Sequence, residues 1–322
     1  MTLVTVAVPA WRPDHLGEAL EGALAQSLDD MEVLVSDDAS PHGIAEVRGP
    51  RVRFVRQPAN LGYPRHVRWL IENARGKYVI VLCDDDFWRS DVLAAQAALL
   101  ERTPGMLLAC TGSLFWEPDR GVARALLHRW PEVVPTEAFF RSSLWDDPTI
   151  ALSSAMFRRD AALAMGLWGD PSLRYSPDLE AWLALALAGP VGYLNRTSCV
   201  TRLHGRQLTH EIGAVERLAD VERVAVRTLA RAGVRRELVA PWLARKLAYA
   251  FAGARLAGAP RGELAAVYER ARGLLRPPWS SLAWASQAMS ERWLGFLRDA
   301  HRRAGGAHEV PLQRVSPASS RS

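Results

Sequence analysis

The first half of the chain alternates short apolar runs with amphipathic segments, and this alternation constrains the fold most strongly. Residues 3–8 (LVTVAV) and 32–36 (EVLVS) have the composition of buried strands, and residues 14–27 between them carry apolar side chains at helical spacing. The order recurs as a strand at 51–56, a helix at 66–74 and a strand at 77–83. We therefore expect an α/β fold with a mostly parallel sheet flanked by helices.

Three of these predicted strands end on acidic or aromatic residues. The ends read Pro9-Ala10-Trp11, Asp37-Asp38 and Asp84-Asp85-Asp86. Ligands of parallel α/β sheets bind beyond the carboxyl ends of the strands. A divalent cation held together with a diphosphate would offset the repulsion within the acidic triplet. An Asp-rich turn that leads into the next helix is the alternative explanation, and the triplet alone does not decide between them.

The rest of the chain divides by composition. We expect a helix at 91–103, a strand at 106–116 and, at 117–148, an irregular insertion suited to forming one wall of a pocket. After about residue 212 the chain is rich in Ala, Leu, Arg and Glu at helical spacing, with breaks at Gly233, 258–260 and 277–278. We therefore predict three parts: a catalytic domain at 1–211, a helical region at 212–304 and a disordered tail at 305–322.

Composition excludes several classes of protein. The hydrophobic content of 49% supports a core, and the net charge of +5 is not gathered in the long basic runs or aromatic ladders of nucleic-acid binders. Cys83, Cys110 and Cys199 are too far apart for a disulfide framework or a zinc knuckle, which favours a reducing compartment. The apolar N-terminal run is too short for a signal peptide. We expect a cytoplasmic protein without a nucleic-acid partner.

Two segments that combine Trp with neighbouring apolar or basic residues, 240–251 and 281–286, leave peripheral attachment at the inner face of the membrane open. Packing between helices explains them equally well and is favoured. The helical region would serve acceptor binding, a membrane contact or a homodimer contact.

Four blocks of sequence, read together, narrow the function. They are VTVAVPAWRPDHLGEALEGALAQSLDDMEVLVSDDAS, NLGYPRHVRWLIENARGKYVIVLCDDDFW, PDLEAWLALALAG and RLHGRQLT. In this order and spacing they resemble family 2 glycosyltransferases of the GT-A fold, over about residues 2–210. The resemblance implies an inverting transfer of a sugar from a nucleoside-diphosphate donor to a hydroxyl acceptor, with Mn²⁺ or Mg²⁺ as cofactor.

The resemblance also implies roles for the strand ends in nucleotide binding. Trp11, next to Pro9 at the end of the first strand, stands where the family often stacks a tyrosine on the base, and an indole offers a larger face. Asp38 is expected to accept hydrogen bonds from the base, while Asp37 is free to fix the turn. Apart from the resemblance, Arg65 and Arg68 in the helix after Asn60 are candidates for a bidentate contact to the diphosphate, with a solvated surface arginine as the alternative.

Within the acidic triplet, the resemblance makes Asp86 the first choice as metal ligand, with Asp84 and Asp85 contacting the ribose or a coordinated water. Alignment on the tryptophan that follows would instead place the family's first aspartate at Cys83, so the register stays open. His204 matches a histidine that approaches the metal and diphosphate, and a neutral imidazole can complete such a shell.

The third block supplies the general base. Alignment on Trp182 places Asp178 at the family's catalytic aspartate and Pro177 where a glutamate usually stands. One carboxylate suffices to take the proton of an attacking hydroxyl. Glu180 is the second choice, and a capping role for Asp178 at the start of its helix is compatible with catalysis.

The donor is expected to be a UDP- or dTDP-sugar, with GDP donors open, and the acceptor a glycan, a lipid-linked glycan or a natural product. A sugar-1-phosphate nucleotidyltransferase would need a glycine-rich, basic loop after the first strand, where this chain has Pro9-Ala10-Trp11-Arg12-Pro13. A non-catalytic scaffold of the same fold is the second alternative, and Cys83 and Pro177 keep it open.

Overall fold

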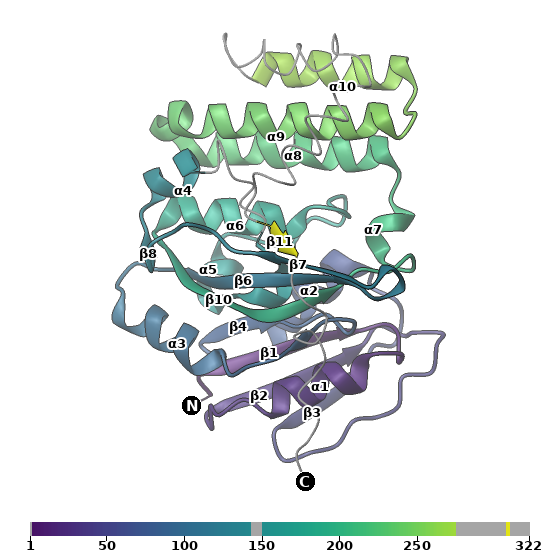
Figure 1. Cartoon of the computed structure of the whole chain (residues 1–322), viewed down its shortest axis with the longest axis vertical. Coiled ribbons are helices and arrows are strands. Elements are labelled where there is room, and N and C mark those ends of the chain that lie inside the picture. The colour runs from purple at the N-terminus through teal and green to yellow at the C-terminus, as the bar shows by residue number, and fades with distance from the viewer. Residues whose placement is uncertain (1, 143–149, 275–306, 310–322) are drawn as a thin grey trace.

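The computed structural model of the chain describes residues 2–142, 150–274 and 307–309 (Figure 1). Its strands form one mixed sheet in the order β11-β7-β6-β9-β4-β1-β2-β3, with β10 beside β6 and paired also to β5 and β8. The strand bounds are β1 Val4–Ala10, β2 Met31–Asp37, β3 Val52–Arg56, β4 Tyr78–Val81, β5 Phe87–Trp88, β6 Leu108–Glu117, β7 Val122–Leu126, β8 Val133–Val134, β9 Ala155–Arg158, β10 Val191–Arg202 and β11 Ala307–Glu309.

The half of the sheet built from β3, β2, β1 and β4 is parallel, as predicted. Val4, Val6 and Val8 of β1 pack with α1 (Leu16–Leu24) and α3 (Leu93–Arg102), while Ala7 points to the other face and packs with α2 (Tyr63–Asn73). Side chains alternate across a strand, so β1 is buried on both faces. This arrangement brings the carboxyl ends of β1, β2 and β4 together at one edge.

The second half of the sheet mixes directions. β9 lies antiparallel between β4 and β6, β7 runs antiparallel to β6, and β10 runs parallel to β6. The prediction of an irregular segment at 117–148 was wrong for β7, for β8 and for α4 (Thr136–Ser142). The short run of β7 becomes a strand because β6 offers it a hydrogen-bonding edge, which the sequence does not reveal. Residues 143–149 lie outside the described residues.

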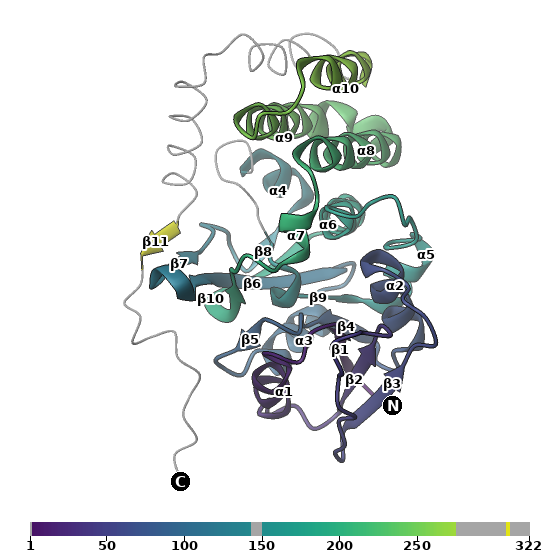
Figure 2. The ribbon, with the colours of Figure 1, turned by 90° about the vertical axis from the view of Figure 1, so that its right-hand side faces the viewer.

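Helices cover the sheet on the side away from α1 (Figures 1 and 2). α6 (Pro177–Ala188) lies between the sheet and a layer formed by α8 (Ala214–Ala232) and α9 (Arg236–Leu256), and α10 (Arg261–Leu274) packs outside them. Two shorter helices, α5 (Arg159–Ala164) and α7 (Leu208–Glu211), connect to these elements. The predicted breaks at Gly233 and 258–260 are confirmed, and 277–278 lies outside the described residues.

The Trp-containing segment 240–251 forms part of α9, and Trp242, Leu247 and Phe251 are buried against the neighbouring helices. Helix packing therefore explains this segment; 281–286 lies outside the described residues. Within the described chain, no helix combines the length and apolar character needed to cross a bilayer. Of the predicted tail, 307–309 pairs with β7 as β11, and the remainder lies outside the described residues.

Candidate active site

Asp84 connects the carboxyl ends of two neighbouring strands. Its Oδ2 accepts the backbone N–H groups of Trp11 and Arg12, each at 2.7 Å. Burial raises the pKa of Asp84 to about 6, against the opposing effect of these two hydrogen bonds. Asp84 therefore holds the segment after β1, where the half-buried indole of Trp11 lies edge-on to His42. The ribose contact expected for Asp84 stays a prediction.

The two aspartates at the end of β2 are buried and have different partners. Asp37 Oδ1 accepts the N–H of Ser40 at 2.8 Å, so Asp37 does fix the turn. Ala39, between Asp38 and Ser40, has φ of 54°, a left-handed conformation that these contacts stabilise. Asp38 accepts the N–H groups of Leu61 at 2.8 Å and Gly62 at 3.1 Å, and thereby orients the start of α2. Its expected contact with the base is not tested by these bonds.

Asp85 and Asp86 point to different surroundings. Asp86 is 4% exposed, and its carboxylate accepts the hydroxyl of Ser153 at 2.7 Å and the backbone N–H of Arg202 at 3.1 Å. The side chain of Asp85 is 23% exposed, and its Oδ2 lies 3.1 Å from Nε2 of His204. Asp85 therefore presents the more accessible carboxylate, and the predicted participation of His204 at this site is supported by its position.

Cys83 completes the acidic cluster. One potential ligand atom each of Cys83, Asp85 and Asp86 lies within 4.8 Å of the others. Burial raises the pKa of the Cys83 thiol well above its usual range, and the charges of Asp86 and Asp85 raise it further. A thiol with so high a pKa stays protonated at neutral pH and is a poor ligand for a hard cation. The oxygen and nitrogen donors of the cluster are therefore the relevant ones.

Two supporting residues escaped the sequence analysis. Arg202 is the first residue of the RLHGRQLT block and was given no role there; its guanidinium lies 4.7 Å from the ring centre of Trp116, pairs with Glu18 and donates from Nε to the Asp85 carbonyl at 3.1 Å. Ser153 binds Asp86 and also accepts the N–H of Cys83 at 3.1 Å. No sequence signal distinguishes this serine from its neighbours, because only the fold brings it to the strand end.

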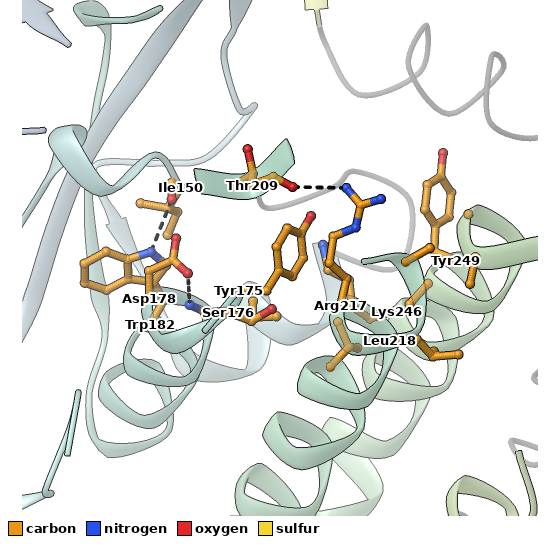
Figure 3. Close-up of a pocket in the computed structure, with 16 residues that line it drawn as sticks. Ile150, Tyr175, Ser176, Asp178, Trp182, Thr209, Arg217, Leu218, Lys246 and Tyr249 are labelled. Carbon is orange, nitrogen blue, oxygen red and sulfur yellow. Dashed lines mark hydrogen bonds between the residues drawn. The ribbon is translucent and has the colours of Figure 1, made fainter. Parts of the chain in front are cut away.

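Asp178, the predicted base, lies in the first turn of α6 and lines a cavity of about 540 Å³ (Figure 3). Its Oδ1 accepts the N–H of Leu179 at 2.8 Å. Burial raises the pKa of Asp178 to about 6, while the positive charge of Lys246 opposes this shift. The cavity lies between α6, α7, α8 and α9, and its described lining includes Ile150, Tyr175, Thr209, Arg217, Leu218, Val221, Tyr249 and Ala254.

Glu180, the second choice as base, is occupied elsewhere. It is 2% exposed, and its carboxylate accepts hydrogen bonds from Arg227 at 3.2 Å and from Arg231 at 2.9 Å, both on α8. Glu180 thus ties α6 to α8, and only Asp178 of the two faces the cavity.

Tyr63 links the cavity to the acidic cluster. Burial raises the pKa of Tyr63 well above its usual range, and the nearby Asp178 and Cys83 raise it further. Both groups therefore act electrostatically on one phenol. A segment of chain also connects the two sites, since Ile150 lines the cavity and Ser153 binds Asp86. Two other predicted residues lie at the margin. Pro9 pairs with Ser36 in the sheet, and Arg65, in the first turn of α2, is exposed.

Comparison with known proteins decides the family. The profile described as "Glycosyl transferase family 2" matches residues 5–165, half of the chain. The chain belongs to this family. It is therefore a glycosyltransferase, as its sequence blocks predicted, and the acidic strand ends lie where the family profile matches.

Curated relatives include larger enzymes. The chain is 27% identical over 254 residues to "Chondroitin synthase" of Escherichia coli, an alignment that covers 74% of this chain and 34% of the relative. It is 25% identical over 199 residues to "Putative teichuronic acid biosynthesis glycosyltransferase TuaG" of Bacillus subtilis, covering 59% of this chain and 75% of the relative. The chain thus spans about a third of the synthase's length.

Solved structures with the same fold include S. aureus TarS residues 1–349 in complex with UDP-GlcNAc, with a TM-score of 0.64, 14% identity and coverage of 94% of this chain and 92% of that one. A mannosyltransferase from Pyrobaculum calidifontis, solved with GDP-Man and Mn²⁺, has a TM-score of 0.53, 15% identity and coverage of 90% and 87%. The predicted GT-A fold with a helical C-terminal region is confirmed.

Proposed function

We propose that this glycosyltransferase moves a sugar from a nucleoside-diphosphate donor to a hydroxyl of a glycan, a lipid-linked glycan or a natural product, with inversion at the anomeric carbon. Residues 1–211 carry donor binding and catalysis, and α8 and α9 of the helical region supply a wall of the acceptor site. A UDP- or dTDP-sugar is the favoured donor. The solved complexes of related fold, with UDP-GlcNAc and with GDP-Man, support a nucleotide sugar. The curated relatives' names support a role in polysaccharide biosynthesis.

The observation that carries the proposal is the placement of two chemical functions side by side. The acidic cluster lies at the carboxyl end of β4, and Asp178 lines the cavity; Ile150 lines the same cavity, and Ser153, on the same segment of chain, binds Asp86. A displacement at a sugar carbon needs a stabilised leaving group on one face and a base for the incoming hydroxyl on the other. A single carboxylate cluster without the second site would not supply both.

The residues of the cluster fit Mn²⁺ or Mg²⁺. Carboxylate oxygens and an imidazole nitrogen suit these cations, and the side chains of Asp85 and His204 already lie 3.1 Å apart. We assign the metal to Asp85 and His204 in preference to Asp86, our first choice from the sequence, because Asp86 is buried and its carboxylate is engaged by Ser153 and Arg202. When bound, the cation would neutralise the departing diphosphate.

Side chains of the protein position the donor and accept the proton. Asp84 fixes the backbone of Trp11, which offers its indole to the base, and Asp38 fixes the start of α2. Asp178 takes the proton of the acceptor hydroxyl. At the same time the hydroxyl oxygen bonds to the anomeric carbon, and the bond from that carbon to the diphosphate oxygen breaks. Attack from the face opposite the leaving group gives the inverted product. The proposal also includes a contact between Asp38 and the nucleotide base and a contact between Arg65 and the diphosphate.

The alternatives make different demands. A nucleotidyltransferase is disfavoured by membership of the glycosyltransferase family and by the proline-flanked Trp11 segment in place of a glycine-rich loop. A scaffold would not need a base in a cavity, and the raised pKa of Asp178 is typical of functional carboxylates.

The test is nucleoside-diphosphate release from UDP-, dTDP- and GDP-sugars by the purified chain, with and without Mn²⁺ or Mg²⁺, followed by transfer to an acceptor panel. We expect one donor to be turned over only with metal present, and Asp85→Ala to abolish that turnover. Glu101→Ala, which removes an exposed carboxylate paired with Lys77 at 2.6 Å, is the control and should retain turnover. Binding of no donor in the presence of metal would favour the scaffold.

A further inference from the structure

The cavity beside Asp178 has an unusual distribution of charge. Much of its described lining is apolar, with Leu218, Val221 and Ala254 among the residues that line it. Asp178, Arg217 and Lys246 are the charged residues in that described lining. The carboxylate comes from α6 and the two cations come from α8 and α9, so a molecule bound here would meet both signs of charge.

Arg217 is held in place by contacts that use only part of its N–H donors. It lies in the first turn of α8 and is half-buried. One N–H reaches the Thr209 carbonyl at 3.4 Å, and the guanidinium lies 5.7 Å from the ring centre of Tyr175. A guanidinium carries five N–H donors, so a planar, bidentate face is left for an anionic partner. Figure 3 shows the side chain directed toward the Thr209 carbonyl, with the Tyr175 ring between Arg217 and Asp178.

Lys246 brings the second cation from α9. It lines the same cavity as Asp178, and its positive charge opposes the upward shift of the Asp178 pKa. Lys77 and Lys246 are the two lysines of a chain whose Lys and Arg total 40, so nearly all other cationic positions are arginine. An ammonium is a compact charge with three rotatable donors and can follow a non-planar anion.

The N-terminus of α8 also lies at the cavity. Ala214, its first residue, lines the cavity, and Gly213 before it provides no side-chain cap. The first N–H groups of a 19-residue helix therefore face this region without a capping side chain. Helix N-termini bind carboxylates and phosphates through these groups and through the helix dipole.

We propose that the acceptor carries an anionic group, a carboxylate or a phosphate, which Arg217 and Lys246 bind while Asp178 faces the hydroxyl to be glycosylated. This inference rests on the proposed function, because it treats the cavity next to the base as the acceptor site. A volume of about 540 Å³ suits a sugar unit with such a group. Tyr175 and Tyr249, on the same lining, offer faces for the sugar ring.

The test uses three acceptors that share one ring and differ at one carbon: methyl glucoside, methyl glucuronide and methyl glucoside 6-phosphate. Transfer is measured with the full chain, its donor and Mn²⁺, and acceptor binding is followed separately by saturation-transfer NMR. We expect one anionic glycoside to exceed the neutral one in kcat/KM by at least about tenfold. The anionic glycoside with the higher kcat/KM shows whether the site prefers a carboxylate or a phosphate.

Variants assign the effect to the two cations. At about pH 8, where Asp178 is ionised in every variant, Arg217→Ala and Lys246→Ala should each lower kcat/KM for the anionic glycoside by about 10- to 100-fold and leave the neutral one within about twofold. Lys246→Arg should restore most of the preference. Lys77→Ala is the matched control, because Lys77 lies in an exposed ion pair with Glu101, and it should change nothing.

Equal transfer to the neutral and anionic glycosides, or binding of no anionic glycoside, would overturn the inference. So would a uniform loss for all three acceptors in Arg217→Ala and Lys246→Ala, since that would indicate a structural role. Acceptor-independent donor hydrolysis separates the two proposals. If the wild-type chain hydrolyses a donor but shows no anionic preference, only this inference fails; if no donor is bound or turned over, the proposed function fails and carries this inference with it.

Discussion

Replacing the proposed base by its amide, Asp178→Asn, should remove catalysis while leaving the fold intact. Asparagine has the same shape and keeps an oxygen for the N–H of Leu179 at 2.8 Å. It cannot take a proton from the acceptor hydroxyl. A positioned general base contributes about 10²- to 10⁴-fold to a rate, so kcat for transfer should fall by that factor.

The pH dependence gives a second, independent magnitude. The pKa of Asp178 is raised from 3.8 to about 6 by burial, and the base must be ionised to act. With that pKa, roughly one molecule in eleven is active at about pH 5 and roughly ten in eleven at about pH 7, a difference of about tenfold. The kcat/KM for the acceptor should therefore rise through about pH 6 and level off above it.

Stability has the opposite dependence on pH. A carboxyl whose pKa is higher in the folded chain stabilises the fold fully below its unfolded value of 3.8, and this contribution is lost as pH rises through about 6. Asp178→Asn does not ionise, so it should unfold at the same or a higher temperature than wild type at about pH 7. Retained thermal stability with lost transfer separates a catalytic defect from a folding defect.

The assay must exclude Asp84, whose pKa is also raised to about 6. Both N–H groups that it binds reach the same oxygen, Oδ2, so Asp84→Asn can keep both bonds and lose the titration. Transfer is measured with saturating Mn²⁺ and donor from about pH 4.5 to about pH 8. A pH limb that survives in Asp84→Asn and is lost from the residual activity of Asp178→Asn belongs to Asp178. An Asp178→Asn enzyme that loses less than about tenfold and keeps the same limb would refute the assignment.

Three further predictions concern metal, structure and packing. Asp85→Asn should weaken Mn²⁺ binding, measured by calorimetry, with little change in melting temperature. Asp86→Ala should instead lower the free energy of unfolding by about 1–3 kcal/mol, because it leaves buried hydrogen-bond donors unpaired. The reverse pattern would restore Asp86 as the metal ligand. Glu180→Gln should destabilise the chain in urea unfolding but leave the pH limb at about 6, and a shifted limb would contradict its structural role. Gly76→Ala should lower stability by about 1–3 kcal/mol, since an added Cβ would meet the backbone nitrogen of Thr5 at 2.4 Å, and an unchanged melting temperature would contradict that contact.

Local sequence determined much of this protein. Alternating apolar strands and amphipathic helices specified the parallel half of the sheet, because periodicity alone decides which side chains are buried. The carboxyl ends of parallel strands meet at one edge, so the acidic and aromatic residues there were predicted as a site. Asp178 was predicted as the base because the block around Trp182 resembles the family's catalytic segment.

Tertiary structure decided the division of labour within the site. The sequence shows three adjacent aspartates as equivalent, but the fold turns Asp84 toward the β1 backbone, Asp86 toward Ser153 and Asp85 toward His204. Pairing with β6 made β7 a strand, and packing of α8 and α9 over α6 brought Arg217 and Lys246 into the cavity that Asp178 lines. These contacts join residues far apart in the chain, and local sequence patterns do not show which distant residues meet in the fold.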